Sequence, residues 1–118
     1  MQLQVTQENL SKALNTVSRV ASSRSTLPIL SNILIKTSGK RLSVSATNLE
    51  IAINQFVGSK ITKEGSITIP ARLMQEFITS LPPSVINLEL EENKLHIKAE
   101  KYTSTINGIS AEEYPIMP

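Results

Sequence analysis

The sequence predicts an α+β fold, a duplicated βαβββ unit in which two helices pack on antiparallel sheets, and three observations support this prediction. Two segments carry apolar residues at the spacing of an amphipathic helix. Most other apolar residues alternate with polar ones, which is typical of strands with one buried and one solvent-facing side. The order of one strand, one helix and three strands occurs twice. Because 118 residues fit one domain, we expect a single domain over residues 1–118.

The two predicted helices are defined by their stripes and their ends. The first is expected over about residues 7–21, with Thr6 as its N-cap. The second is expected over about residues 70–81, because Pro70 suits a first helical position and the Pro82–Pro83 pair stops a helix. The apolar stripes consist of Leu10, Ala13, Leu14, Val17, Val20 and Ala21 in the first helix, and of Leu73, Met74, Phe77, Ile78 and Leu81 in the second.

Strands are predicted wherever apolar and polar residues alternate. The alternating segments are about 2–5, 33–35, 42–46, 49–54, 66–69, 86–91, 95–100 and 102–107. Turns are expected between several of them, at Ser38-Gly39-Lys40 and at Glu92-Asn93. The pattern therefore favours hairpins and antiparallel sheets.

The two halves can be superposed. A shift of 53 residues places ILIKTSGKRLSVSATNLEIAI on INLELEENKLHIKAEKYTSTI without a gap, so that Leu42 meets Leu95 and Ile53 meets Ile106. The halves differ after the helix, where Ser22–Asn32 is much longer than the matching Pro82–Val85 connection. Since loops carry function more often than cores do, this extra piece is a candidate functional segment.

The composition excludes most catalytic and metal sites. There is no Asp and no Cys, and His96 is the one histidine, so a Ser-His-Asp triad or a zinc site cannot be assembled. We expect no catalytic residue, no metal and no cofactor. The absence of Cys fits a reducing compartment, no apolar run approaches the length of a membrane span and the N-terminus is not a signal peptide, so a cytoplasmic protein without a membrane partner is expected.

Cations gather on the predicted helix surfaces and the extra loop. They are Lys12, Arg19, Arg24 and Arg72, and the acids among them are Glu8 and Glu76. One interpretation is an ordinary solvated helix face with a Glu8–Lys12 pair. The other is a mildly cationic face that contacts phosphates without reading bases. The residues alone leave both interpretations open, for Arg24 as for the others.

Four stretches carry a resemblance to a known family. STLPILSNILI, SATNLEIAI, GSITIPARLMQEFITSLP and NGISAEEYP occur in this order along the chain. Together they resemble the N-terminal domain of the bacterial DNA polymerase III beta subunit, the sliding clamp, over essentially all residues. The resemblance implies a subunit of three such domains, of which this chain is the first. Two subunits would close head to tail into a ring around duplex DNA and confer processivity on the polymerase without catalysis.

The resemblance also implies particular site residues. Arg24 and Arg72 match the family's DNA-contacting arginines. A surface formed by the second helix and the last strand would meet the third domain of the other subunit, here near Leu73, Phe77, Ser104 and Ile106. The groove that takes polymerase and repair-protein peptides would lie in the other two domains, so polymerase and clamp loader are expected partners mainly of the full-length protein.

Two other functions remain as alternatives. One is a βαβββ module that binds single-stranded nucleic acid, and the other is a plain protein-interaction domain. The chain has only two Phe, two Tyr and no Trp, which counts against the first alternative because such sheets stack bases on exposed aromatic side chains.

Overall fold

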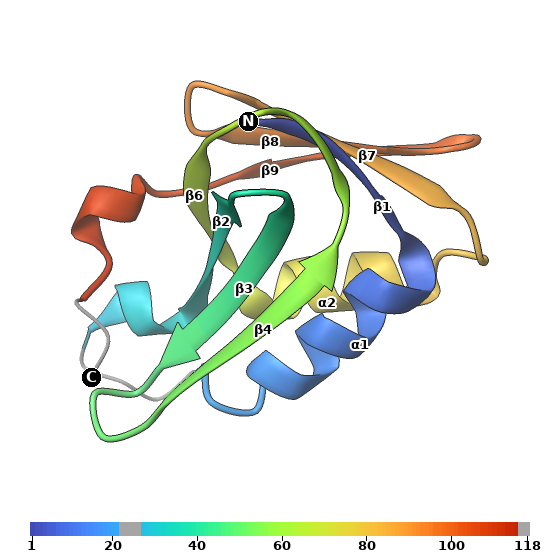
Figure 1. The fold of residues 1–118 in the computed structure, drawn as a ribbon. Helices are drawn as coiled ribbons and strands as arrows, with labels where there is room; N and C mark the ends of the chain where they lie inside the picture. The colour runs from blue at the N-terminus through green and yellow to red at the C-terminus, as the bar shows by residue number, and fades with distance from the viewer. Residues whose placement is uncertain (22–26, 116–118) are drawn as a thin grey trace.

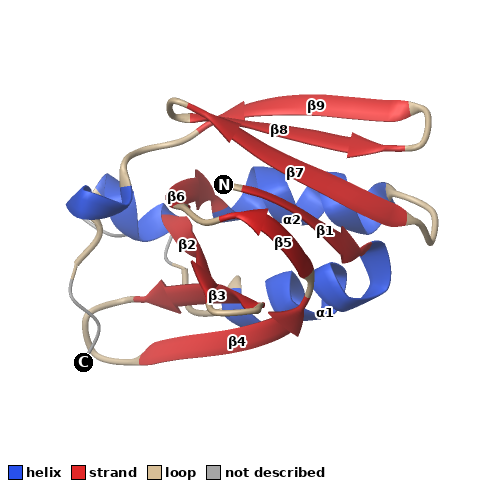
Figure 2. Cartoon of the chain, turned by 45° about the horizontal axis from the view of Figure 1, so that its top comes forward, coloured by secondary structure: helices blue, strands red, loops and turns tan. Residues whose placement is uncertain are grey.

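Two antiparallel sheets and two helices make up the fold. The computed structural model describes residues 1–21 and 27–115. The strands are β1 (Gln2–Thr6), β2 (Asn32–Ser38), β3 (Arg41–Thr47), β4 (Ala52–Gly58), β5 (Lys60–Lys63), β6 (Ser66–Pro70), β7 (Val85–Glu91), β8 (Lys94–Ala99) and β9 (Tyr102–Asn107). One sheet has the order β5-β1-β7-β8-β9 and the other β4-β3-β2-β6. The helices α1 (Gln7–Val17) and α2 (Ala71–Ser80) lie side by side against the strands (Figures 1 and 2).

The helices begin and end close to where the sequence places them, with two corrections. Thr6 caps α1 as predicted, because its hydroxyl accepts a hydrogen bond from the Asn9 N–H at 3.3 Å. The helix ends at Val17 rather than at residue 21, and Val20 and Ala21 follow in a turn whose side chains still pack against the core. Pro70 is the last residue of β6 and precedes α2, instead of being the first helical residue.

The predicted duplication is present, and the two halves exchange strands. β1 opens the first half but pairs with β7 of the second, with Val5 opposite Ile86. β6 opens the second half but pairs with β2 of the first, with Ile69 opposite Ile33. Each sheet therefore contains strands from both halves, and the two repeats form one structural unit.

The superposition of the halves is correct for two strands and wrong for the third. β3 and β8 occupy matching places, since Leu42 and Leu95 both lie in the core. However, Leu42 pairs with Val57, whereas Leu95 pairs with Ile106. Val57, not Ile53, is thus the counterpart of Ile106, because the turn between β3 and β4 is longer than the turn between β8 and β9. The predicted strand 49–54 accordingly starts later, at residue 52.

One strand was not predicted. β5 follows β4 after a single residue, so the chain runs from the edge of one sheet to the edge of the other. There it pairs with β1, with Leu3 opposite Ile61. Three of its four residues, in the sequence KITK, are polar and exposed. The segment therefore lacks the alternation that predicts a strand.

The core and the C-terminal segment hold these layers together. A single cluster of buried aliphatic side chains joins both helices to both sheets. After β9 the chain crosses to the other sheet, where Ile109 forms an isolated bridge with Thr68. A short 3-10 helix, η2 (Ala111–Glu113), leads to Tyr114, which is 7% exposed and packs against the same sheet.

Candidate nucleic-acid interface

The outward surfaces of α1 and α2 form one continuous polar face. Residues on the buried sides of the helices, such as Leu14 and Met74, are fully covered, whereas Asn15 and Gln75 face outward. The Gln75 Nε2 donates to the Asn15 Oδ1 at 2.8 Å and so joins the two helices across this face. We call the outward surface of the two helices the helix face.

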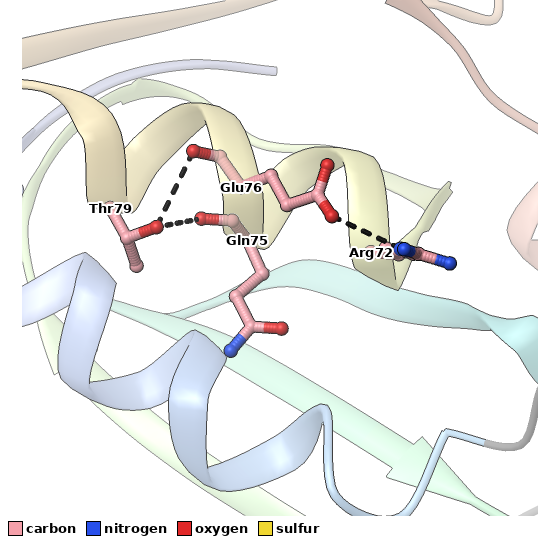
Figure 3. A network of polar contacts seen from close by, with 4 residues as sticks. All are labelled: Arg72, Gln75, Glu76 and Thr79. Atoms are coloured by element: carbon pink, nitrogen blue, oxygen red, sulfur yellow. Dashed lines mark hydrogen bonds and ion pairs between the residues drawn. The ribbon is translucent and has the colours of Figure 1, made fainter.

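Arg72 stands at one end of the helix face, in the first turn of α2. Its side chain is 89% exposed, and its Nε lies 3.0 Å from the Glu76 Oε1 (Figure 3). Such an exposed pair is worth at most about 1 kcal/mol, so a phosphate can displace the carboxylate at little cost. Arg72 thus lies on the outward surface of α2, and its contact with DNA stays a prediction.

The start of α2 adds positive potential around Arg72. Pro70 occupies the N-cap position without a side-chain hydrogen bond, and the first turn contains no acid. The first N–H groups of a helix point outward and favour anions when no side chain caps them. Arg72 and these N–H groups therefore reinforce one another as a place for a phosphate.

The other cations predicted for this face are Lys12, Arg19 and Arg24. Lys12 on α1 lies 3.4 Å from Glu8, as the i,i+4 spacing predicts, and both side chains are mostly exposed. Arg19 is exposed just after α1. Arg24 lies outside the described residues, so the structure does not position it.

A shallow hollow borders Arg72 between the end of α1 and the start of α2. It is lined by Ser18, Ala21, Ser31, Ala71, Arg72, Gln75 and Glu76. Ala21, the last described residue before the segment that carries Arg24, is one of the lining residues. The sequence did not indicate the hollow, because Ser31 and Ala71 have no distinctive pattern.

A second groove brings together all four residues of the predicted subunit interface. It lies between α2 and β9 and is lined by Leu73, Phe77, Ser104, Thr105, Ile106 and Asn107. Leu73 is 56% exposed although it belongs to the apolar stripe of its helix. β9 is the last strand of its sheet, so its outer backbone groups have no strand partner within the described fold. We call this surface the α2–β9 groove.

The described residues offer no arrangement for base stacking or metal binding. The exposed rings of Phe56 and Tyr102 lie on edge strands of different sheets, and Phe56 is stacked against the Arg41 guanidinium at 4.1 Å. Within residues 1–21 and 27–115, no three acidic or histidine side chains come close enough to hold a metal ion. His96 contacts Thr105 at 2.9 Å and Glu91 at 3.7 Å on an open sheet surface.

The exchanged βαβββ repeats and the paired helices define the class of domain as the α+β domain of DNA clamps. The crystal structure of the DNA polymerase III subunit beta from Pseudomonas aeruginosa matches all of this chain and 32% of its own chain, with a TM-score of 0.94 and 33% identity. The Caulobacter crescentus pol III beta structure matches equally well, with a TM-score of 0.94, 35% identity, and coverage of 100% of this chain and 32% of that one.

Sequence comparison gives the same result. The Pseudomonas aeruginosa protein named beta sliding clamp is 36% identical over 117 residues, which are 98% of this chain and 32% of that protein. The family described as DNA polymerase III beta subunit, N-terminal domain, matches residues 1–118. The chain belongs to this family. It spans about a third of the length of the relatives it matches. The resemblance and the fold class inferred from the sequence are thereby confirmed.

Proposed function

We propose that this chain is the first of three domains of a DNA polymerase III sliding clamp subunit, a cytoplasmic, non-catalytic processivity factor. In the assembled ring, the helix face would line the hole and contact duplex DNA through phosphates, independently of sequence. The observation that carries the proposal is the position of Arg72, exposed beside the uncapped start of α2 on a face formed by two adjacent helices.

The weak pairing of Arg72 suits a clamp that must slide. The arginine has a carboxylate one turn away, so it exchanges one anion for another as the DNA moves past. The face contains amides and hydroxyls between its cations, and these contact phosphates without selecting a base. Both features favour weak, mobile binding over a fixed complex.

The α2–β9 groove is proposed as the contact with the third domain of the second subunit. Leu73, Phe77 and Ile106 offer apolar area there, and the free edge of β9 offers backbone groups for an added strand. A face that meets a different face of its partner makes a head-to-tail contact, which closes into a ring if the rotation allows. Polymerase and clamp loader would bind mainly through the two domains outside this chain.

The test uses the full-length subunit and the Arg24→Ala, Arg72→Ala double variant. Duplex binding should weaken to a similar extent for all sequences, because phosphate contacts are lost. The salt dependence of binding should fall by about one unit for each lost contact. Titrations of labelled duplexes of unrelated sequence at several salt concentrations measure both quantities.

A matched control removes the same charge from the opposite side. Lys60 and Lys98 are exposed on the sheet strands β5 and β8, away from the helix face. The Lys60→Ala, Lys98→Ala variant should retain more of the affinity and of the salt slope. If the arginine variant binds like the wild type, or no worse than this control, these arginines are not the DNA contacts.

A further inference from the structure

The turn between β3 and β4 holds two exposed aliphatic side chains in a fixed conformation. Thr47 Oγ1 donates to the Ile51 carbonyl at 2.9 Å and accepts from the Leu49 N–H at 3.1 Å. Asn48 Oδ1 accepts from the N–H groups of Glu50 and Ile51 at 3.0 and 2.9 Å. Leu49 and Ile51 are nevertheless 55% and 54% exposed. We call Asn48–Ile51 the apolar turn.

Leu49 is in a conformation that leucine rarely adopts. Its φ is +79°, in the left-handed region that usually belongs to Gly, Asn or Asp. An ordinary surface turn would place a small polar residue here, because more than half of the leucine side chain is exposed in the described structure. A strained position occupied by an exposed leucine is an outlier of the kind that motivates a functional hypothesis.

The equivalent turn in the second half shows that the fold itself does not require apolar residues. β8 and β9 are joined through Glu100 and Lys101, and Ala99 pairs directly with Tyr102. Both turn residues are charged and exposed, and Glu100 supplies the positive φ of +51°. The greater length and the leucine and isoleucine of the apolar turn are therefore a specific feature of the first half.

The last described residues of the chain lie beside the apolar turn. The Tyr114 hydroxyl accepts from the Thr47 N–H at 3.1 Å and donates to the Asn32 carbonyl at 3.3 Å. Thr47 is the residue that begins the hydrogen bonding of the turn. This chain matches an N-terminal domain and covers about a third of its relatives. In a subunit of that length, the next domain follows Tyr114 in the sequence. Tyr114 is held at Thr47, two residues before Leu49.

We propose that the apolar turn is the surface that contacts the second domain of the full-length subunit. Leu49 and Ile51 would insert into an apolar recess of that domain, while Tyr114 fixes where the connecting segment starts. A turn that is already locked by hydrogen bonds loses little conformational entropy on docking. The inference depends on the three-domain length of the subunit but not on DNA binding.

The test compares Leu49→Asn, Ile51→Thr with the wild type in the full-length subunit. Asn tolerates a positive φ and Thr keeps a β-branched shape, so the turn conformation is retained while its apolar area is removed. Limited proteolysis of the segment after residue 118 should become about fivefold faster or more, because undocking exposes that segment more often. Hydrogen exchange of the same segment should rise in parallel.

Two controls make the result specific. Val85 is 53% exposed at the start of β7, at the far end of the domain from the apolar turn (Figure 1), so Val85→Thr should leave cleavage unchanged. In the 118-residue chain, the turn variant should unfold at the wild-type temperature or above it, since a strained exposed leucine is replaced.

Three outcomes would overturn the proposal. The first is that the full-length turn variant shows the same cleavage and hydrogen exchange as the wild type. If such a variant instead loses the binding of another protein, the turn is a site for an external partner. The second is an equal loss of stability in the 118-residue chain, which would make the turn part of the domain core. The third is an equal effect of Val85→Thr.

Discussion

Tyr114 links three distant parts of the chain through one buried phenol. Its hydroxyl bridges the Thr47 N–H and the Asn32 carbonyl, and its ring covers the end of the sheet that contains β2 and β3. Burial raises the pKa of the Tyr114 phenol above its ordinary value of 10.0, and the hydrogen bond from Thr47 offsets this only in part. Burial thus favours the neutral form of the phenol in the folded state.

Tyr114→Phe is expected to lower the free energy of unfolding by about 1–3 kcal/mol, because the Thr47 N–H loses its partner inside the protein. The difference from the wild type should also depend on pH. Since the folded-state pKa is raised, the contribution of Tyr114 is complete below about pH 10 and declines as the pH rises through the folded-state pKa. Denaturant unfolding of both proteins at about pH 8 and about pH 10.5 measures this.

The exposed Tyr102 is present in both proteins and cancels in this comparison. A constant difference between the two pH values would show that the ionisation of Tyr114 is not linked to folding. An absent difference at the lower pH would show that the bridging hydroxyl contributes nothing to stability.

At the scale of elements, Gly108 allows the chain to cross between the sheets. A Cβ at this position would lie 2.5 Å from the Thr68 carbonyl oxygen and 2.7 Å from Ile67 Cγ1. Gly108→Ala is therefore expected to destabilise the domain by about 1–3 kcal/mol, because backbone cannot move aside as a flexible side chain would. Thermal unfolding of the 118-residue chain is the measurement.

Gly58 provides the matched control for this change. A Cβ there would meet nothing within 4 Å. Gly58→Ala should be neutral or stabilise by up to about 1 kcal/mol through the unfolded state. Equal unfolding temperatures for the two alanine variants would contradict a packing role for Gly108.

The elements also show where sequence patterns fail. β5 was missed because Ile61 is the one apolar residue among its four and edge strands need little burial. The start of β4 was misplaced because Leu49 and Ile51 continue the alternation of a strand through a hydrogen-bonded turn. The periodicity of apolar residues indicates which side chains can be buried, but it does not indicate where a turn ends and a strand begins.

The residues of the α2–β9 groove could be predicted from the sequence only in part. The stripe of α2 is wider than its buried side, since Met74 and Ile78 are covered while Leu73 remains exposed. The exposure of Leu73 is known from the structure, and an exposed apolar side chain of this kind favours a docking surface. The proximity of Ser104 and Ile106 to this helix came from the family resemblance alone, because pairing between a helix and a distant strand leaves no local pattern.

At the scale of the whole molecule, the interface proposed for the α2–β9 groove requires the third domain of a second subunit. The 118-residue chain is expected to sediment as a monomer at all accessible concentrations, and a full-length subunit as a dimer. Leu73→Asp in the full-length protein should shift it towards monomers, because a charge would be buried in an apolar contact. Sedimentation over a range of concentrations measures both.

Val85→Asp serves as the control, since Val85 is similarly exposed outside the groove. A concentration-independent dimer of the 118-residue chain would argue against a head-to-tail contact. An unchanged dimer of the Leu73→Asp variant would place the subunit interface elsewhere.

The exchange of strands between the halves also governs the order in which the domain can form during synthesis. β1 leaves the ribosome first, yet its central partner β7 is among the last strands to emerge. The other sheet is complete once β6 is available, at residue 70. In a nascent chain, all strands of the β4-β3-β2-β6 sheet are therefore available before β1 can pair with β7. Neither repeat can complete its own strand pairing without the other, and such long-range pairing is typical of slower folding.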